Sequence, residues 1–171
     1  MNKCAWANSS ELLKRYHDEE WGKPIHDDQK LFEILILESM SCGLSWEIVL
    51  KKRNRMREVF DNFDPKKIAL YTDERIDAFM QDQSIIRHKK KLEAMVQNAK
   101  AYLKLTKTRS FNNFLWEYVG YKTILNKSQK IVTRNEISDR LGKDLKKLGF
   151  KIRWFSDCLF IHASCWNGKR S

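Results

Sequence analysis

Glycine and proline are scarce in this chain, with 6 and 2 copies among 171 residues. Because both residues mark turns and interrupt regular structure, their scarcity favours long helices over a fold rich in tight turns. Apolar runs are also short: the stretch LFEILILESM carries two glutamates and is well below the roughly 18 residues of a membrane-spanning helix. The first residues, MNKCAWANSS, lack the apolar core of a signal peptide. We therefore expect a cytoplasmic protein without membrane association.

No CxxC pair occurs in the sequence, and its four cysteines are widely spaced: Cys4, Cys42, Cys158 and Cys165. A chain without a secretion signal keeps its thiols reduced, which argues against a disulfide framework. Reduced thiols or a metal site built from distant segments are the two interpretations that this spacing leaves open.

Positive charge is abundant: 33 basic against 22 acidic residues give a net charge of +11 and a pI near 9.5. Such a balance indicates a polyanionic partner, either nucleic acid or an anionic membrane surface, although a lysine-rich soluble surface is the alternative. Hydrophobic residues make up 42% of the chain, enough for a sizeable core. Without repeats or a flexible linker, we expect one domain over residues 1–171.

Helix signals dominate the sequence, so we predict an all-α fold. Apolar residues recur at helical spacing from Leu92 to Leu103. Side chains suited to helix N-caps precede several segments: Asp27 or Asp28, Ser45, Asp64 before Pro65, Thr72, Ser84 and Ser110. Gly120 and Gly149 follow apolar helical segments and are suited to left-handed C-caps.

A helix, a tight turn and a second helix are predicted over about residues 138–165. Leu141, Leu145 and Leu148 are predicted to form one apolar face, and Gly149 ends the first helix. The unpaired N–H groups of the turn, beside Lys151 and Arg153, would grip a DNA phosphate without reading sequence. An ordinary helical hairpin is the alternative. A second basic run, IIRHKKKLE at residues 85–93, is either another phosphate contact or a solvated helix face.

One acid and several aromatic side chains gather in the first fifty residues: Glu38, Tyr16, Trp46, Trp6 and Trp21. Burying a carboxylate is costly unless a cation or a hydrogen-bond donor meets it. Aromatic walls around one acid suit a flat cationic guest, because the rings stack on it and the carboxylate pairs with its charge. Each aromatic taken alone is equally compatible with ordinary core packing.

The motifs YHDEEWG, LFE, LE and GLSW, continued by FDPKKIA, IIRHKKKLEAMVQNAKAY and LKKLGFK, resemble the bacterial DNA-3-methyladenine glycosylase I family. The resemblance extends to about residue 165. It implies a helix-hairpin-helix fold that flips an alkylated adenine out of double-stranded DNA and hydrolyses its N-glycosidic bond. It also implies a monofunctional, monomeric enzyme without a redox or nucleotide cofactor.

The same resemblance implies a role for each matching position. Glu38 and Tyr16 would hydrogen-bond the flipped base, and Trp46 would stack on it. The remaining positions would form the pocket wall (Trp6 and Trp21), fill the gap in the duplex (Gly43 and Leu44) and bind phosphate (Gly149, Lys151 and Arg153). Because N3-methylation makes adenine cationic, Glu38 would favour the damaged base over normal adenine. We accordingly predict that Glu38→Gln keeps the fold but sharply reduces base release.

Cys4 and His17 match the first half of a structural zinc site in this family. The family completes that site with a histidine and a cysteine in its tail, whereas this sequence reads HASCWNGKRS there. Local substitutes are His162 and Cys165, with Cys158, and the family gives those two cysteines no ligand role. A four-ligand zinc site rebuilt from these residues is one alternative, and loss of zinc, which we favour, is the other.

Two further functions are compatible with the basic charge. A relative without activity would bind duplex or damaged DNA through the hairpin, and a helix-turn-helix repressor would read sequence. The repressor does not explain the aromatic residues around Glu38. Release of free 3-methyladenine distinguishes the enzyme from both.

Overall fold

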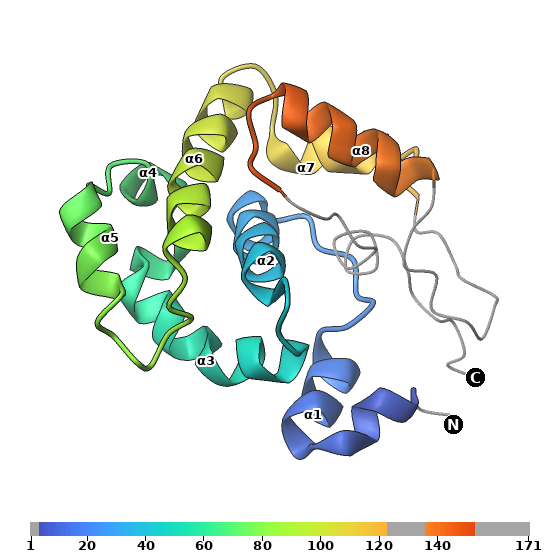
Figure 1. Cartoon of the computed structure of the whole chain (residues 1–171). Helices are drawn as coiled ribbons and strands as arrows, with labels where there is room; N and C mark the ends of the chain where they lie inside the picture. Colours follow the sequence, from blue (N-terminus) through green and yellow to red (C-terminus); the bar gives the residue numbers. More distant parts are fainter. Residues whose placement is uncertain (1–3, 123–135, 153–171) are drawn as a thin grey trace.

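The computed structural model describes residues 4–122 and 136–152, and the regular secondary structure in those ranges is all helical (Figure 1). This confirms the predicted all-α fold. The elements in chain order are η1 (Ala5–Ser9), α1 (Glu11–Glu19), α2 (Asp28–Ser41), α3 (Trp46–Val59), η2 (Asp61–Phe63), α4 (Pro65–Ile68), α5 (Asp73–Phe79), α6 (Lys89–Thr106), α7 (Phe111–Glu117) and α8 (Glu136–Lys147). None of the helices in the described ranges is both long and apolar enough to cross a membrane.

Helix α2 is the centre of the fold, and α3, α6 and α7 pack around it (Figure 1). Its side chains from Leu31 to Leu37 are all buried, so the helix is enclosed on nearly every side. This burial explains why the apolar run that opens at Leu31 shows little helical periodicity. The main core extends from α2 to Leu145 and Phe150 at the end of α8.

Most predicted caps are confirmed. The side chains of Asp27, Ser45, Thr72 and Ser110 each accept a hydrogen bond from a backbone N–H three residues later, and Asp64 accepts one from Lys66. The neighbour of Asp27 has a different function: the Asp28 carboxylate accepts hydrogen bonds from the N–H groups of Phe111 and Asn112, at 3.0 and 2.7 Å. It thereby joins the start of α2 to the start of α7.

The predicted cap at Ser84 is wrong. Helix α6 begins at Lys89 with His88 at its N-cap, and Ser84 lies in the preceding turn. There its hydroxyl and its backbone N–H both donate to Oδ1 of Asp82. A local side-chain acceptor thus competes with helix formation at this point, as acidic residues often do in turns.

The end of α8 agrees with prediction in its turn and differs in its apolar face. Gly149 has a φ of +94°, and the N–H of Phe150 donates to the carbonyl of Leu145 at 3.0 Å, as in a Schellman motif. Leu141 and Leu145 are fully buried. Leu148 is 37% exposed, because the helix ends at Lys147 and the following turn carries this side chain outwards. The predicted second helix of the hairpin lies outside the described residues.

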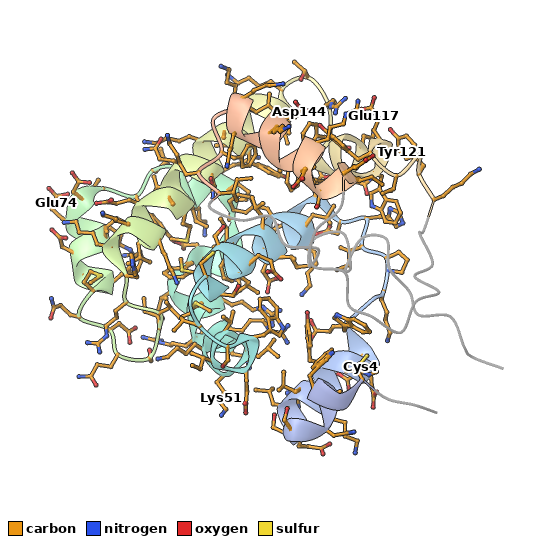
Figure 2. All side chains as sticks on the ribbon, turned by 45° about the vertical axis from the view of Figure 1, so that its right-hand side comes forward. Cys4, Lys51, Glu74, Glu117, Tyr121 and Asp144 are labelled. Atoms are coloured by element: carbon orange, nitrogen blue, oxygen red, sulfur yellow. The ribbon has the colours of Figure 1, made fainter. Side chains whose placement is uncertain are left out.

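Helix α1 and η1 form a separate lobe at one end of the molecule (Figure 1). Cys4 marks this lobe in Figure 2, well away from Asp144 on α8. The lobe has its own small core of Leu13, Tyr16 and Leu50, the last contributed by α3. Helix α1 therefore packs chiefly against η1 and α3.

Candidate functional site

A pocket of about 200 Å³ opens where α1, α2 and α3 meet. Its size suits a single planar group, since pockets for larger ligands measure roughly 300–1,000 Å³. The lining residues are Tyr16, Glu19, Glu20, Lys23, Ile25, Lys30, Glu33, Ile34, Leu37, Trp46 and Arg53. Two of the residues predicted for base recognition, Tyr16 and Trp46, are therefore in its wall.

Tyr16 and Trp46 reach the pocket from different helices. Their ring centroids lie 5.6 Å apart with an interplanar angle of 52°. Tyr16 is buried in the last turns of α1, whereas Trp46 is the first residue of α3 because Ser45 caps that helix. The tilt between the rings leaves two aromatic surfaces facing one cavity, an arrangement that can hold a flat guest by stacking.

Trp6 and Trp21 lie behind Tyr16 and do not line the pocket. The ring of Trp6 is 6.4 Å from that of Tyr16 and 5.5 Å from that of Trp21 in an edge arrangement. The imidazole of His17 stacks on Trp21 at 5.2 Å. These rings therefore support Tyr16 from behind, and direct contact of either tryptophan with a base stays a prediction.

Glu38 lies on α2 immediately after Leu37, which lines the pocket. Glu38 is not itself a lining residue, but it is half-buried and its Oε1 atom is shielded from solvent. At least one oxygen of this carboxylate is therefore kept away from open water. Its direct hydrogen bond to a base stays a prediction.

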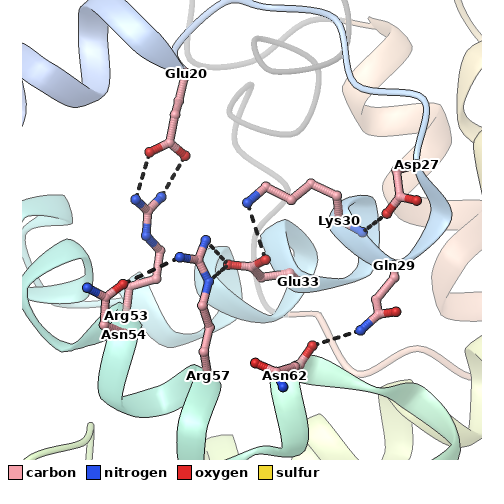
Figure 3. Close-up of polar contacts among 9 residues, drawn as sticks. All are labelled: Glu20, Asp27, Gln29, Lys30, Glu33, Arg53, Asn54, Arg57 and Asn62. Atoms are coloured by element: carbon pink, nitrogen blue, oxygen red, sulfur yellow. Dashed lines mark hydrogen bonds and ion pairs between the residues drawn. The ribbon is translucent and has the colours of Figure 1, made fainter.

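Sequence reasoning missed the charged wall of the pocket (Figure 3). The guanidinium of Arg53 donates two parallel hydrogen bonds to the carboxylate of Glu20, at 2.6 and 2.7 Å. Beside it, the buried carboxylate of Glu33 meets Arg57 at 2.7 Å and Lys30 at 3.4 Å. Arg53 comes 33 positions after Glu20, so no local pattern signals this pair.

Electrostatics keep the Glu20–Arg53 pair ionised. Burial would raise the pKa of the Glu20 carboxyl, but the Arg53 hydrogen bonds and charge outweigh it and hold that pKa below its ordinary value. Burial would likewise lower the pKa of Arg53, and Glu20 raises it above its ordinary value. The pocket therefore contains a permanent bidentate ion pair.

The segment after α2 presents an apolar side chain to solvent. Gly43 has a φ of +77°, a conformation that favours glycine. Among the described residues, and apart from its two chain neighbours, nothing lies within 4 Å of the place where a Cβ would be. Leu44 follows it and is 39% exposed, as is Ile48 in the first turn of α3. This geometry fits the predicted wedge, which would enter the gap left by a flipped nucleotide.

The three lysines of the basic run at residues 85–93 differ in structure. Lys89 pairs with Asp77 at 2.7 Å on the surface. Lys91 turns inward, and its ammonium donates to the carbonyls of Met40 and Cys42 at the end of α2. Lys90 is exposed. The interpretation as one uniform phosphate-binding run is therefore too simple.

The predicted phosphate-binding turn is anchored from α6. The Oδ1 atom of Asn98, a fully buried residue, accepts a hydrogen bond from the backbone N–H of Lys151 at 2.6 Å. The side chain of Lys151 is exposed beside Gly149. Arg153, also predicted to bind phosphate, lies outside the described residues.

Two of the predicted zinc ligands lie in the N-terminal lobe. Cys4 is a half-buried free thiol, and burial raises its pKa. Nδ1 of His17 lies 3.0 Å from the Asp18 carboxylate, and an Nδ1–H that donates there leaves Nε2 to bind a metal. His162 and Cys165 lie outside the described residues. Within residues 4–122 and 136–152, no three or more His, Cys, Asp and Glu side chains gather as a metal site would require.

Comparison with known proteins agrees with this geometry. The family model described as methyladenine glycosylase matches residues 6–153. The chain is 49% identical over 152 residues to the DNA-3-methyladenine glycosylase of Haemophilus influenzae, covering 86% of this chain and 82% of that protein. It is 39% identical over 169 residues to DNA-3-methyladenine glycosylase 1 of Escherichia coli, covering 96% and 90%.

A solved structure gives the same result at the level of the fold. The 3-methyladenine DNA glycosylase I of Staphylococcus aureus, studied for its recognition of 3-methyladenine, superposes with a TM-score of 0.89 at 38% identity, covering 95% of this chain and 90% of that one. These matches confirm the resemblance drawn from the sequence motifs. The chain belongs to the methyladenine glycosylase family.

Proposed function

We propose that Glu38, Tyr16 and Trp46 recognise the base when this chain acts on alkylated DNA. The chain is a DNA-3-methyladenine glycosylase, which excises 3-methyladenine by hydrolysing the N-glycosidic bond. The observation that supports the residue roles is the meeting of Tyr16 and Trp46 at one small pocket. Glu38 follows the lining residue Leu37 on α2, and one of its carboxylate oxygens is shielded from solvent.

The reaction requires little acid catalysis from the protein. Methylation at N3 gives the attached adenine a positive charge, so the base leaves readily when the bond to C1′ of the deoxyribose breaks. The bonding electrons move to the base and neutralise it, while water adds a hydroxyl to C1′ and loses a proton. The protein contributes by extruding the base, holding it and stabilising the cationic sugar.

Selection of the damaged base follows from charge. A flipped 3-methyladenine would pair its positive charge with the Glu38 carboxylate and stack on Trp46. Normal adenine would bring no charge, so the carboxylate would lose water without gaining an ionic partner. The aromatic surface would bind both bases, and the carboxylate would discriminate between them by charge.

We propose that the DNA form is double-stranded and that the chain acts as a cytoplasmic monomer. Leu44 is exposed after a glycine of positive φ, which supports a role in filling the gap in a duplex. The amides around Gly149, with Lys151 beside them, would hold a phosphate. Since phosphate contacts release counterions, DNA binding should weaken steeply with salt.

We propose that Cys4 and His17 take no part in base release. A structural zinc site needs four ligands, so zinc would be held here only if His162 and Cys165 joined this pair. Metal analysis of the purified protein tests this point. About one zinc ion per chain would indicate such a rebuilt site, and its absence would indicate that zinc is lost.

Base release by Glu38→Gln tests the central proposal. Purified protein is incubated with methylated DNA, and the liberated bases are identified by mass. We expect the wild-type chain to release 3-methyladenine, and Glu38→Gln to do so roughly 10- to 100-fold more slowly, the worth of one charge-assisted hydrogen bond. Glu47→Gln is the matched control, because Glu47 is a nearby acid that pairs with Lys51 along α3.

Three results are informative. Unchanged release by Glu38→Gln would remove the role assigned to this residue. DNA binding by the wild-type chain without any base release would indicate the inactive DNA-binding relative that the sequence left open. Sequence-specific protection of DNA in a footprinting experiment would instead indicate a repressor.

A further inference from the structure

The geometry points to Glu20 and Arg53 as a positioning pair: their ion pair fixes the distance between Tyr16 and Trp46, the two aromatic walls of the pocket. This inference rests on the function proposed for that pocket. Neither side chain is given a chemical step, and each would act through the aromatic residue on its own helix.

The pair joins the two helices that carry the two aromatic walls. Glu20 is the C-cap of α1, and its backbone N–H donates to the carbonyl of Tyr16 at 2.9 Å. Arg53 lies on α3 about two turns after Trp46, which is on the same side of the helix. The bidentate contact of 2.6 and 2.7 Å therefore ties the turn of Tyr16 directly to the helix of Trp46 (Figure 3).

The small core shared by α1 and α3 is apolar. It contains Leu13, Tyr16 and Leu50, and four further side chains pack against it: Trp6, Leu12, Trp21 and Trp46. Apolar contacts hold the two helices together but have no directional preference. Two parallel hydrogen bonds between a planar guanidinium and a carboxylate do impose a direction. The pair is also sheltered, with 14% of the Arg53 side chain and 31% of the Glu20 side chain exposed.

A second ion-pair network lies near Arg53 (Figure 3). Glu33 is bound by Arg57 at 2.7 Å and by Lys30 at 3.4 Å, and Arg57 also donates to Asn54 on the same helix at 3.4 Å. The negative charge of Glu33 contributes to the raised pKa of Arg53, so it favours the charged guanidinium that Glu20 binds.

The charges that line the pocket are balanced: three are acidic (Glu19, Glu20 and Glu33) and three are basic (Lys23, Lys30 and Arg53). This balance allows a clear test. If the pair acted only through charge on a cationic base, Glu20→Gln would weaken recognition and Arg53→Met would strengthen it. If the pair positions the walls, both substitutions should slow base release.

The experiment measures single-turnover release of 3-methyladenine from methylated duplex DNA by the full chain. Variants are Glu20→Gln, Arg53→Met, the double variant and Arg53→Lys. We expect each single variant to slow release by about 10- to 100-fold, the scale of an ångström-sized misplacement. The double variant should be no slower than the slower single variant, because the pair acts as one unit. Arg53→Lys keeps the positive charge but cannot donate two parallel hydrogen bonds from a planar group, so this variant should also be slow.

Two controls separate positioning from loss of structure. Arg55 lies on the same helix as Arg53, and Arg55→Met breaks its surface ion pairs with Glu58 and Asp82. This variant should release base at the wild-type rate. Affinity for undamaged duplex should stay unchanged in every variant, since Leu44 and Lys151 are not touched. All rates are measured at a temperature at which circular dichroism shows the variant to be folded.

A coupling measurement completes the test. Tyr16→Phe is made in the wild-type and in the Glu20→Gln background, and its effect should shrink in the second, because Tyr16 is already displaced there. Equal effects in both backgrounds, opposite effects of Glu20→Gln and Arg53→Met, or full activity in Arg53→Lys would each overturn the inference. If the wild-type chain released no base, the proposed function would fail instead.

Discussion

Lys91 of α6 closes the carboxyl end of α2: its ammonium donates to the carbonyl of Cys42 at 2.6 Å and to that of Met40 at 2.9 Å. The last carbonyls of a helix have no partner within it and carry its negative end. A half-buried lysine therefore stabilises the point at which the chain turns into Gly43 and Leu44. We expect this contact to help set the direction in which the proposed wedge leaves the protein.

Replacing Lys91 by methionine should affect both stability and base release. The variant keeps the aliphatic length but leaves two carbonyls without their charged donor, which should lower the free energy of unfolding by about 1–3 kcal/mol. A looser α2 end should also slow release from duplex DNA. Denaturant unfolding and single-turnover release measure the two effects.

Lys90→Met is the matched control for that variant. Lys90 directly precedes Lys91 on the same helix and is exposed. The Lys90→Met variant should therefore keep the wild-type stability and lose only some salt-dependent DNA affinity. Equal stability of the Lys91 and Lys90 variants would show that the Lys91 contact does not stabilise the end of α2.

Asn98→Ala should loosen the phosphate-binding turn from within. Asn98 is fully buried, and its side chain holds the N–H of Lys151 at 2.6 Å. Its loss leaves a backbone donor unsatisfied and should cost about 1–3 kcal/mol of unfolding free energy. Duplex affinity should fall as well, because the turn would no longer present its amides in one arrangement.

The matching surface change is Lys151→Ala, which removes one charge and leaves the turn intact. It should weaken duplex binding and reduce the slope of log affinity against log salt concentration by about one, without altering stability. An unchanged salt slope would show that Lys151 does not meet a phosphate. Fluorescence anisotropy at several salt concentrations measures both variants.

Local signals in the sequence predicted much of the fold. Ser45 and Asp27 were recognisable as caps because their acceptors lie three residues from the donors they bind. Gly149 was recognisable because a left-handed turn after an apolar helix favours glycine. Ser84 looks equally suitable, but its hydroxyl and N–H donate to Asp82 within a turn, and the helix begins only at Lys89. Such competition between two local patterns is decided by geometry that the sequence does not contain.

Contacts between distant residues were not predictable in this way. Lys89 and Lys91 are neighbours in one basic run, yet one pairs with Asp77 at the surface and the other caps α2. Successive side chains leave a helix about 100° apart, so identical residues meet different surroundings. The Glu20–Arg53 pair likewise depends on how α1 docks on α3. The sequence therefore identified the aromatic residues of the site and missed the ion pair between their helices.

Stability at alkaline pH should report the contact between α7 and α8. The hydroxyl of Tyr118 donates to Asp144 at 2.8 Å, and burial together with this carboxylate raises the pKa of Tyr118 to about 12. The ordinary pKa is about 10, so between these values the unfolded chain has lost a proton that the folded chain keeps. Stability from this group is therefore complete below pH 10 and falls as the pH rises through 12.

Tyr118→Phe tests this assignment. At pH 8 the variant should lose about 1 kcal/mol with the hydrogen bond. Its further loss of stability at alkaline pH should be smaller than that of the wild-type chain, because one titrating group has gone. Tyr102, whose pKa burial also raises to about 12, continues to contribute in both proteins. Urea unfolding at pH 8 and pH 11 measures the difference, and parallel losses in both proteins would contradict the role of Tyr118.

Leu44→Ala should distinguish duplex from single-stranded substrates. The side chain is 39% exposed, so its truncation should leave the unfolding free energy within about 0.5 kcal/mol of wild type. In a duplex, an apolar side chain that fills the vacated space offsets part of the unstacking cost, and its loss should slow base release roughly tenfold. A methylated single strand has no such gap, so its base should be released at the wild-type rate.

Leu70→Ala, at a site 79% exposed near α4, controls for the loss of surface leucine. Equal slowing on both substrates would place Leu44 in the base pocket and not in the duplex.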